Sequence, residues 1–343
     1  MKAMLLREIG PVGKESQPLV YSDVREPSLQ EGEILIRVKA CGVCHTELDE
    51  IEGRTPPPRL PVILGHQVVG VVEHAAGTAA GPVGIGQRVG VAWIYSACGQ
   101  CKYCLEGNEN LCPDFRATGR DANGGYAQYM RVRADFAHPI PDTIPDLEAA
   151  PLLCAGAVGY RALRLSNLSD GENLGLTGFG ASNHLILKMV QHKYLGARVF
   201  VFTRSEGERE FARSLGATWA GAIADTPPEQ LHAVIDATPV WRPITEALKH
   251  LAPGGRLVIN AIRKEKADEQ ALAEIDYPTQ LWMEKEIKSV ANVTRRDVRE
   301  FLQLAAEARI HPEVQEYPLA DANRALVELR QGHIRGAKVL RVE

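Results

Sequence analysis

Two cysteines and one histidine that lie far apart in the sequence place the strongest constraint on how this chain folds. They are Cys44, which is followed by His45 and Thr46, then His66, and finally Cys154. Two thiolates and one imidazole form the ligand set of a catalytic zinc ion, because three protein ligands leave one tetrahedral position open. A fold that uses this set must bring three distant segments to one point.

Each of these residues also has a simpler interpretation. Cys154 follows two leucines, as an ordinary buried thiol does, and His66 could be a core histidine. Cys41 is an alternative ligand to Cys44. Cys44 is favoured because it is adjacent to the His-Thr pair and fits an open site with three ligands.

A second group of cysteines lies within a single short segment. Cys98, Cys101, Cys104 and Cys112 follow the spacing C-x2-C-x2-C-x7-C. Four thiolates that leave no position for a substrate predict a closed, structural zinc site. An iron–sulfur cluster uses similar spacing and is the chemical alternative. Zinc is favoured because the chain already carries a zinc-type set of two cysteines and one histidine.

The bulk properties limit the class of protein. A length of 343 residues predicts two domains. The net charge of −4, without a basic run, argues against nucleic acid or an anionic membrane surface as a partner. The N-terminal apolar run is too short for a signal peptide, and no segment is long enough for a membrane helix. The odd number of cysteines, 7, then predicts metal or catalytic thiols in a reducing, cytoplasmic compartment.

The local pattern changes about halfway along the chain. Short strands separated by glycine and proline predict a compact, barrel-like β domain before residue 152. Alternating strands and helices after it predict βαβ units around a parallel sheet, with strands at 173–177, 198–202, 232–236 and 256–260. Residues 311–343 have a strand–helix–strand pattern that returns to the first domain. The predicted domains are therefore 1–152 with 296–343, and 153–295.

A glycine-rich turn follows the first strand of the second domain. Glycines at this place let a backbone approach a pyrophosphate at a helix N-terminus. The match to GxGxxG is partial, since Gly178 and Gly180 are present but Asn183 occupies the third position. Its place between a strand and a helix strengthens the prediction. The expected coenzyme-binding residues of the turn are Gly178, Phe179, Gly180, Ala181 and Ser182.

The end of the next strand bears on which dinucleotide binds. NAD enzymes usually place an acid here, and NADP enzymes an arginine. The residues are Thr203, Arg204 and Ser205, and the first carboxylate is Glu206. Two hydroxyls and a guanidinium suit a 2′-phosphate, so NADP(H) is favoured and NAD(H) is the alternative.

Taken together, these motifs resemble the zinc-dependent medium-chain alcohol dehydrogenases, and the resemblance covers nearly the whole chain. It implies an α/β protein with a GroES-like β-barrel catalytic domain and a Rossmann doubly wound coenzyme domain. It implies two zinc ions per chain, one catalytic and one structural, and a homotetramer or homodimer. It also implies that Thr46 accepts the alcohol proton, that His45 lies near the coenzyme phosphates and that Trp93 lines the substrate pocket.

The chain departs from the family pattern at four positions. Gln67 replaces a glutamate behind the metal, and Glu47 replaces an aspartate that supports the zinc-ligand imidazole. Asp49 stands where many members have the histidine that ends the proton relay. Ala337 replaces an arginine that grips the coenzyme pyrophosphate, and Arg335 is the expected substitute.

The resemblance implies a dehydrogenase or aldehyde reductase with a small-molecule substrate. Thr46 and Trp93 predict a narrow, apolar pocket, which suits primary aliphatic or aromatic alcohols and their aldehydes. A polyol, sugar or other dehydrogenase of the same superfamily is one alternative. A zinc- and NADP-binding protein without alcohol chemistry is the other.

Overall fold

The computed structural model describes residues 1–77, 83–332 and 336–342. The chain divides into two compact units, here called unit 1 (Met1–Cys154 with Val293–Glu343) and unit 2 (Ala155–Asn292). The expected coenzyme ligand Arg335 lies outside the described residues. Among those residues, no helix is both long and apolar enough to cross a membrane.

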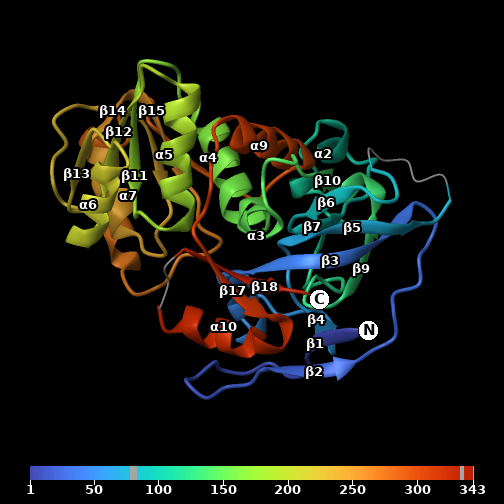
Figure 1. Ribbon diagram of the computed structural model, residues 1–343. Helices are drawn as coiled ribbons and strands as arrows, with labels where there is room; N and C mark the ends of the chain where they lie inside the picture. Colours follow the sequence, from blue (N-terminus) through green and yellow to red (C-terminus); the bar gives the residue numbers. More distant parts are fainter. Residues whose placement is uncertain (78–82, 333–335, 343) are drawn as a thin grey trace. The chain divides into compact units, whose positions relative to one another are not determined.

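Unit 1 is built around a sheet in the order β10-β6-β5-β3-β18-β17, with β9 also pairing with β3 (Figure 1). A second sheet has the order β2-β1-β4, and β7 pairs with β8. The strands are β1 (Lys2–Leu6), β2 (Leu19–Asp23), β3 (Glu33–Val43), β4 (Val62–Ile63), β5 (Val68–Ala75), β6 (Arg88–Val91), β7 (Ile94–Ser96), β8 (Arg116–Ala117), β9 (Tyr129–Arg133), β10 (Ala137–Pro139), β17 (Val314–Pro318) and β18 (Ala337–Arg341). The helices are α1 (His45–Ile51), α2 (Lys102–Leu105), α3 (Asp146–Pro151), α9 (Arg295–Glu307) and α10 (Ala322–Arg330).

The C-terminal segment completes this sheet, as its strand–helix–strand pattern predicts. Strand β18 runs antiparallel to β3 and places Leu340 opposite Cys41, so residues from both ends of the chain lie side by side (Figure 1). Helix α9 begins with a capping box, in which Thr294 and Asp297 exchange hydrogen bonds between side chain and backbone. Strand β3 pairs with β5, β9 and β18, so it lies inside the sheet, and it ends at Val43, next to Cys44.

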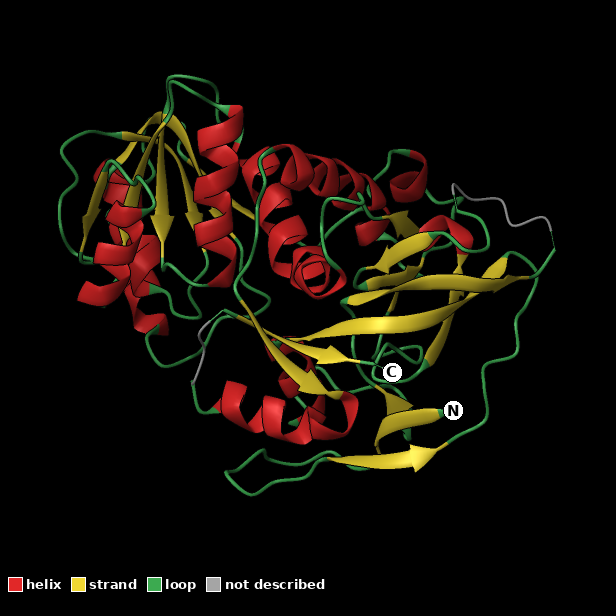
Figure 2. Cartoon of the chain, viewed as in Figure 1, coloured by secondary structure: helices red, strands yellow, loops and turns green. Residues whose placement is uncertain are grey.

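Unit 2 contains six parallel strands in the order β13-β12-β11-β14-β15-β16. In chain order this is 3-2-1-4-5-6, the order of a Rossmann dinucleotide-binding fold. Figure 2 shows its strands in yellow with helices in red beside them. The strands are β11 (Asn173–Thr177), β12 (Arg198–Phe202), β13 (Trp219–Gly221), β14 (Leu231–Asp236), β15 (Leu251–Ile259) and β16 (Glu286–Ser289). The helices are α4 (Ala157–Ser166), α5 (Ala181–Lys193), α6 (Glu206–Ser214), α7 (Arg242–Lys249) and α8 (Tyr277–Gln280).

Candidate active site

Helix α1 positions the first group of site residues. It begins at the N-cap Cys44, whose extended backbone (φ −133°, ψ 166°) turns the chain out of β3. The Cys44 amide donates a 2.8 Å hydrogen bond to Oε2 of Glu47, three residues later. This closes the helix N-terminus in the manner of a capping box and fixes Cys44 relative to Glu47.

The other oxygen of Glu47 holds the predicted histidine ligand. Oε1 of Glu47 lies 2.5 Å from Nδ1 of His66, and both side chains are fully buried. Burial alone lowers the pKa of His66, but the charges of Glu47 and Cys44 raise it well above its usual value. Glu47 therefore reaches His66 in spite of its longer side chain, and it orients the imidazole as carboxylates orient zinc-bound histidines.

Among the described residues, the second nitrogen of His66, Nε2, is buried and has no hydrogen-bond partner. A donor atom of His66 lies within 4.8 Å of the sulfurs of Cys44 and Cys154, and these three atoms form one group. A hydrogen bond between the two thiols lowers the pKa of Cys44 and raises that of Cys154. The donor set and the unpartnered nitrogen fit a zinc ion with one open position.

Cys154 enters this group from an element that the sequence pattern did not reveal. Residues Leu152–Gly156 form a π-helical turn between α3 and α4. A π turn inserts one extra residue into a helix and re-aims its side chains, and such turns are frequent at functional sites.

The structure places the other predicted residues of unit 1 as follows. Thr46 is buried, with Oγ1 3.7 Å from the sulfur of Cys44, whereas His45 is exposed. Asp49 is buried and forms an ion pair with Arg54. Gln67 is buried beside Gly42, where any Cβ atom would lie 2.4 Å from its Oε1.

Trp93 lies among aromatic and cationic side chains. Its ring centroid is 4.8 Å from that of Phe115, and the Arg120 guanidinium lies 5.6 Å from the ring. Its Nε1 is buried without a hydrogen-bond partner among the described residues. The surroundings of Trp93 are therefore less apolar than the sequence predicts.

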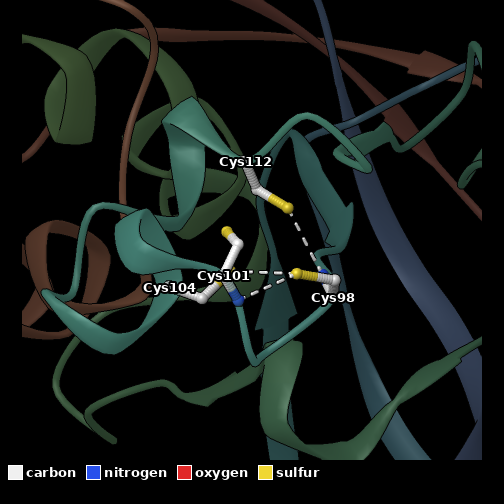
Figure 3. A group of neighbouring side chains, drawn as sticks. All are labelled: Cys98, Cys101, Cys104 and Cys112. Carbon is white, nitrogen blue, oxygen red and sulfur yellow. Dashed lines mark hydrogen bonds between the residues drawn. The ribbon is translucent and has the colours of Figure 1, made fainter.

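The four cysteines of the second group meet in one lobe of unit 1 (Figure 3). Their sulfurs all lie within 4.8 Å of one another, and those of Cys98 and Cys104 are 3.9 Å apart. Tetrahedral zinc with Zn–S bonds of ~2.3 Å requires sulfurs about 3.8 Å apart. Backbone amides beside Cys98 lower the pKa of its thiol to about 7, as suits a metal-binding thiolate. The geometry fits the predicted structural zinc.

The glycine-rich turn lies between β11 and α5, as predicted. Gly178 has a φ of +74°, which favours glycine. The Asn183 side chain donates hydrogen bonds to the carbonyl oxygens of Thr177 (3.0 Å) and Gly178 (2.8 Å). Asn183 therefore stabilises the turn from the position where the usual motif has its third glycine. Of the other turn residues, Phe179 is buried, while Gly180 and Ala181 are exposed.

The neighbouring Ser182 connects the turn to two other segments of unit 2. It donates a 3.1 Å hydrogen bond to the carbonyl oxygen of Ala155 and accepts a 3.0 Å bond from Asn260. These bonds engage the Ser182 hydroxyl within the protein. We therefore expect the backbone of the turn to make its main contact with a pyrophosphate.

At the end of β12, a carboxylate lies closer than the sequence suggests. The Thr203 hydroxyl donates a hydrogen bond to Glu208 of helix α6, and Ser205 is the N-cap of this helix. Arg204 is exposed. Only the fold shows that Glu208 reaches back to the strand end, because five positions separate it from Thr203.

Sequence reasoning also missed a buried ion pair beside the turn. Asp236, at the end of β14, accepts hydrogen bonds from Thr177 (2.6 Å), Thr238 (2.7 Å) and Lys264 (2.5 Å). Asp236 is fully buried, and the Lys264 side chain is 8% exposed. The pair fixes the ends of β11 and β14, and no local sequence signal links two residues so far apart.

Known proteins are similar to this chain in sequence and in fold. Residues 30–142 match the alcohol dehydrogenase GroES-like domain, and residues 191–307 match the zinc-binding dehydrogenase domain. The probable alcohol dehydrogenase AdhA of Mycobacterium tuberculosis is 44% identical over 99% of this chain and 97% of its own length.

Two solved structures extend the comparison. The cobalt- and zinc-bound thermostable alcohol dehydrogenase of Pyrobaculum aerophilum is 26% identical, with a TM-score of 0.81, covering 98% of this chain and 99% of that one. The cinnamyl alcohol dehydrogenase SbCAD4 of Sorghum bicolor is 25% identical, with a TM-score of 0.81, covering 99% of this chain and 97% of that one.

The fold and these similarities define a two-domain oxidoreductase with a GroES-like and a Rossmann domain, which confirms the predicted fold class. The chain belongs to the zinc-dependent medium-chain alcohol dehydrogenase family.

Proposed function

We propose that this chain is a zinc-dependent dehydrogenase that transfers hydride between NADP(H) and primary aliphatic or aromatic alcohols or aldehydes. One observation carries the proposal: Cys44, His66 and Cys154 present three donor atoms within 4.8 Å of one another, and Nε2 of His66 is buried without a partner. We assign the catalytic metal to unit 1 and the coenzyme to unit 2.

The residues of unit 1 prepare a proton acceptor beside the metal ligands. When bound, zinc supplies Lewis-acid polarisation of the substrate oxygen, and the nicotinamide exchanges the hydride. Thr46 Oγ1, 3.7 Å from the Cys44 sulfur, is placed to accept the alcohol proton. Glu47 holds His66 so that Nε2 serves as the ligand atom. Asp49 is the proposed relay exit, and it is already ion-paired with Arg54.

The substrate class follows from Thr46 and Trp93. The rings of Trp93 and Phe115, which contact each other at a tilted angle of 34°, are apolar groups suited to an aromatic or aliphatic chain. The Sorghum bicolor relative is described as a cinnamyl alcohol dehydrogenase, which supports an aromatic alcohol among the substrates. The Pyrobaculum aerophilum structure contains bound cobalt and zinc, which supports a zinc site in this chain.

For the coenzyme we propose NADP(H) over NAD(H). Arg204 is exposed at the end of β12 and is available to bind a 2′-phosphate. The Thr203 hydroxyl is engaged by Glu208, so Arg204 and Ser205 carry the preference. Glu208 opposes the preference for NADP(H), because its carboxylate repels a phosphate.

We further propose that the chain assembles as a homodimer or homotetramer. All four residues of the edge strand β16 are exposed, including Ile287 at 44%. Tyr277 and Trp282, at 58% and 56%, lie close to it in the sequence. An exposed edge strand presents unpaired backbone groups and is a template for pairing with a second chain. Light scattering of Ile287→Lys should show a smaller particle than the unmodified protein.

The central experiment follows NADPH and NADH oxidation with a panel of aldehydes, before and after metal removal with a chelator. We expect turnover that the chelator abolishes and zinc restores, with a higher rate for NADPH. A protein that retains two zinc ions per chain but turns over no aldehyde would refute the proposal. Turnover confined to sugars or polyols would assign the chain to a different branch of the superfamily.

A further inference from the structure

Helix α1 carries a third buried carboxylate, Glu50, besides Glu47 and Asp49, and the oxygens of Glu50 have no hydrogen-bond partner among the described residues. Glu50 is 1% exposed, and neither Oε1 nor Oε2 has such a partner among the described residues. Glu47, one helical turn earlier, uses both of its oxygens. Burying a carboxylate without compensation is strongly unfavourable, so a positive charge is expected nearby.

The surroundings of Glu50 are those of the metal ligands. Residues three and four positions apart share a helix face, so Glu50 lies on the face of Glu47 and Thr46. Burial raises the pKa of Glu50 well above its usual value, and the charges of Glu47 and Cys44 raise it further, whereas those of His66 and Arg120 lower it. Glu50 thus lies within electrostatic reach of His66.

The loop that carries Arg120 is packed against the His66 segment. A Cβ atom added to Gly119 would lie 2.9 Å from the amide nitrogen of Gly65. The Arg120 guanidinium also donates hydrogen bonds of 3.2 and 2.8 Å to Asp121. Arg120 is therefore already shared with another carboxylate and compensates Glu50 only in part.

A divalent ion at Cys44, His66 and Cys154 would bring a positive charge close to Glu50, in addition to the negative charges of the two thiolates that balance the ion formally. Gln67, the residue next to His66, is neutral and lies against Gly42. Helix α1, rather than the His66 segment, therefore provides the second acid near this group. The donor set already satisfies the coordination of zinc with one open position, so Glu50 is placed to act on the metal through its charge.

We propose that Glu50 is a positioning residue of the catalytic metal site, and that its carboxylate retains the metal ion at Cys44, His66 and Cys154 by electrostatic attraction. The inference rests on the proposed function only in that a divalent metal occupies these three ligands. It assigns to Glu50 a role in metal retention, distinct from substrate binding.

The test compares zinc release from the unmodified protein with release from Glu50→Gln, using a chromogenic chelator in excess. We expect Glu50→Gln to lose one zinc per chain roughly 10 to 100 times faster, the usual effect of removing a supporting residue. The zinc of the four-cysteine lobe is an internal control, and its release should not change. Adding Gln67→Glu to Glu50→Gln should slow the release again, because it returns a carboxylate beside His66.

Glu52→Gln is the matched control variant. Glu52 lies at the C-terminal end of the same helix and is paired with Arg54 and Arg330. It should release zinc as the unmodified protein does. In cobalt-substituted protein, the visible absorption of the Cys44 site should shift in Glu50→Gln and not in Glu52→Gln.

Equal release from Glu50→Gln and the unmodified protein would overturn the proposal. Equal acceleration at both zinc sites would also overturn it, because it would indicate general destabilisation. Failure of the proposed function is a separate outcome, since it is measured as aldehyde turnover by fully zinc-loaded protein. The zinc release rates test the role of Glu50 even if the protein turns over no aldehyde.

Discussion

Replacing Arg204 by alanine should shift the coenzyme preference from NADP(H) toward NAD(H). Arg204 is exposed at the end of β12 and makes no interaction with a described residue, so its removal should not disturb the fold. A hydrogen bond to a charged group contributes about 1.5–3 kcal/mol. This corresponds to roughly 10 to 150-fold in affinity, and solvent screening of an exposed arginine favours the lower end.

The assay is the dissociation constant of each coenzyme, measured by fluorescence titration. In Arg204→Ala the constant for NADPH should rise about tenfold while that for NADH stays the same. Glu208→Gln should act in the opposite direction, because it removes a carboxylate and leaves the Thr203 hydroxyl able to donate to a phosphate. Glu210→Gln, on the exposed face of the same helix, is the control. An unchanged NADPH to NADH ratio in Arg204→Ala would refute the reasoning.

Three further predictions concern single contacts. Glu47→Gln should weaken metal binding at His66 by roughly 10 to 100-fold in a competition titration, because the carboxylate beside Nδ1 is lost. Asp236→Asn leaves Lys264 buried without its counter-ion and should destabilise unit 2 by about 3–5 kcal/mol, measured by hydrogen exchange of β11 and β14. Asp236→Asn combined with Lys264→Met should cost less than the sum of the two single changes. Trp93→Ala should extend turnover to bulkier or secondary alcohols, and an unchanged substrate ranking would contradict its place in the pocket.

Local patterns were sufficient where a short segment alone determines the structure. The runs at 173–177 and 198–202 coincide with β11 and β12. In 198–202, alternating valine and phenylalanine favour a strand. The cysteine spacing predicted the four-sulfur group, because the four cysteines lie close together in the sequence. The strand Trp219–Gly221 was missed, since three residues form no pattern.

Features that depend on distant residues could not be obtained in this way. Local sequence carries no signal for the π-helical turn Leu152–Gly156, which holds Cys154. The sequence shows Glu50 as one of several acids in a polar segment, and only the fold reveals that it is buried. The Arg120 guanidinium beside Trp93 likewise appears only when two separate loops meet.

Glu47 illustrates how a departure from the family pattern is explained by local structure. At the third position of helix α1, a glutamate is long enough for Oε2 to accept the N-cap amide of Cys44 at 2.8 Å. Its Oε1 meets His66 at 2.5 Å at the same time. One side chain thus fixes two of the proposed metal ligands, which come from different segments. Glu47→Asp keeps the charge but shortens the reach, so we expect it to retain the bond to only one of them. Weaker metal binding in Glu47→Asp than in the unmodified protein would support this, and equal binding would show that the extra methylene is not needed.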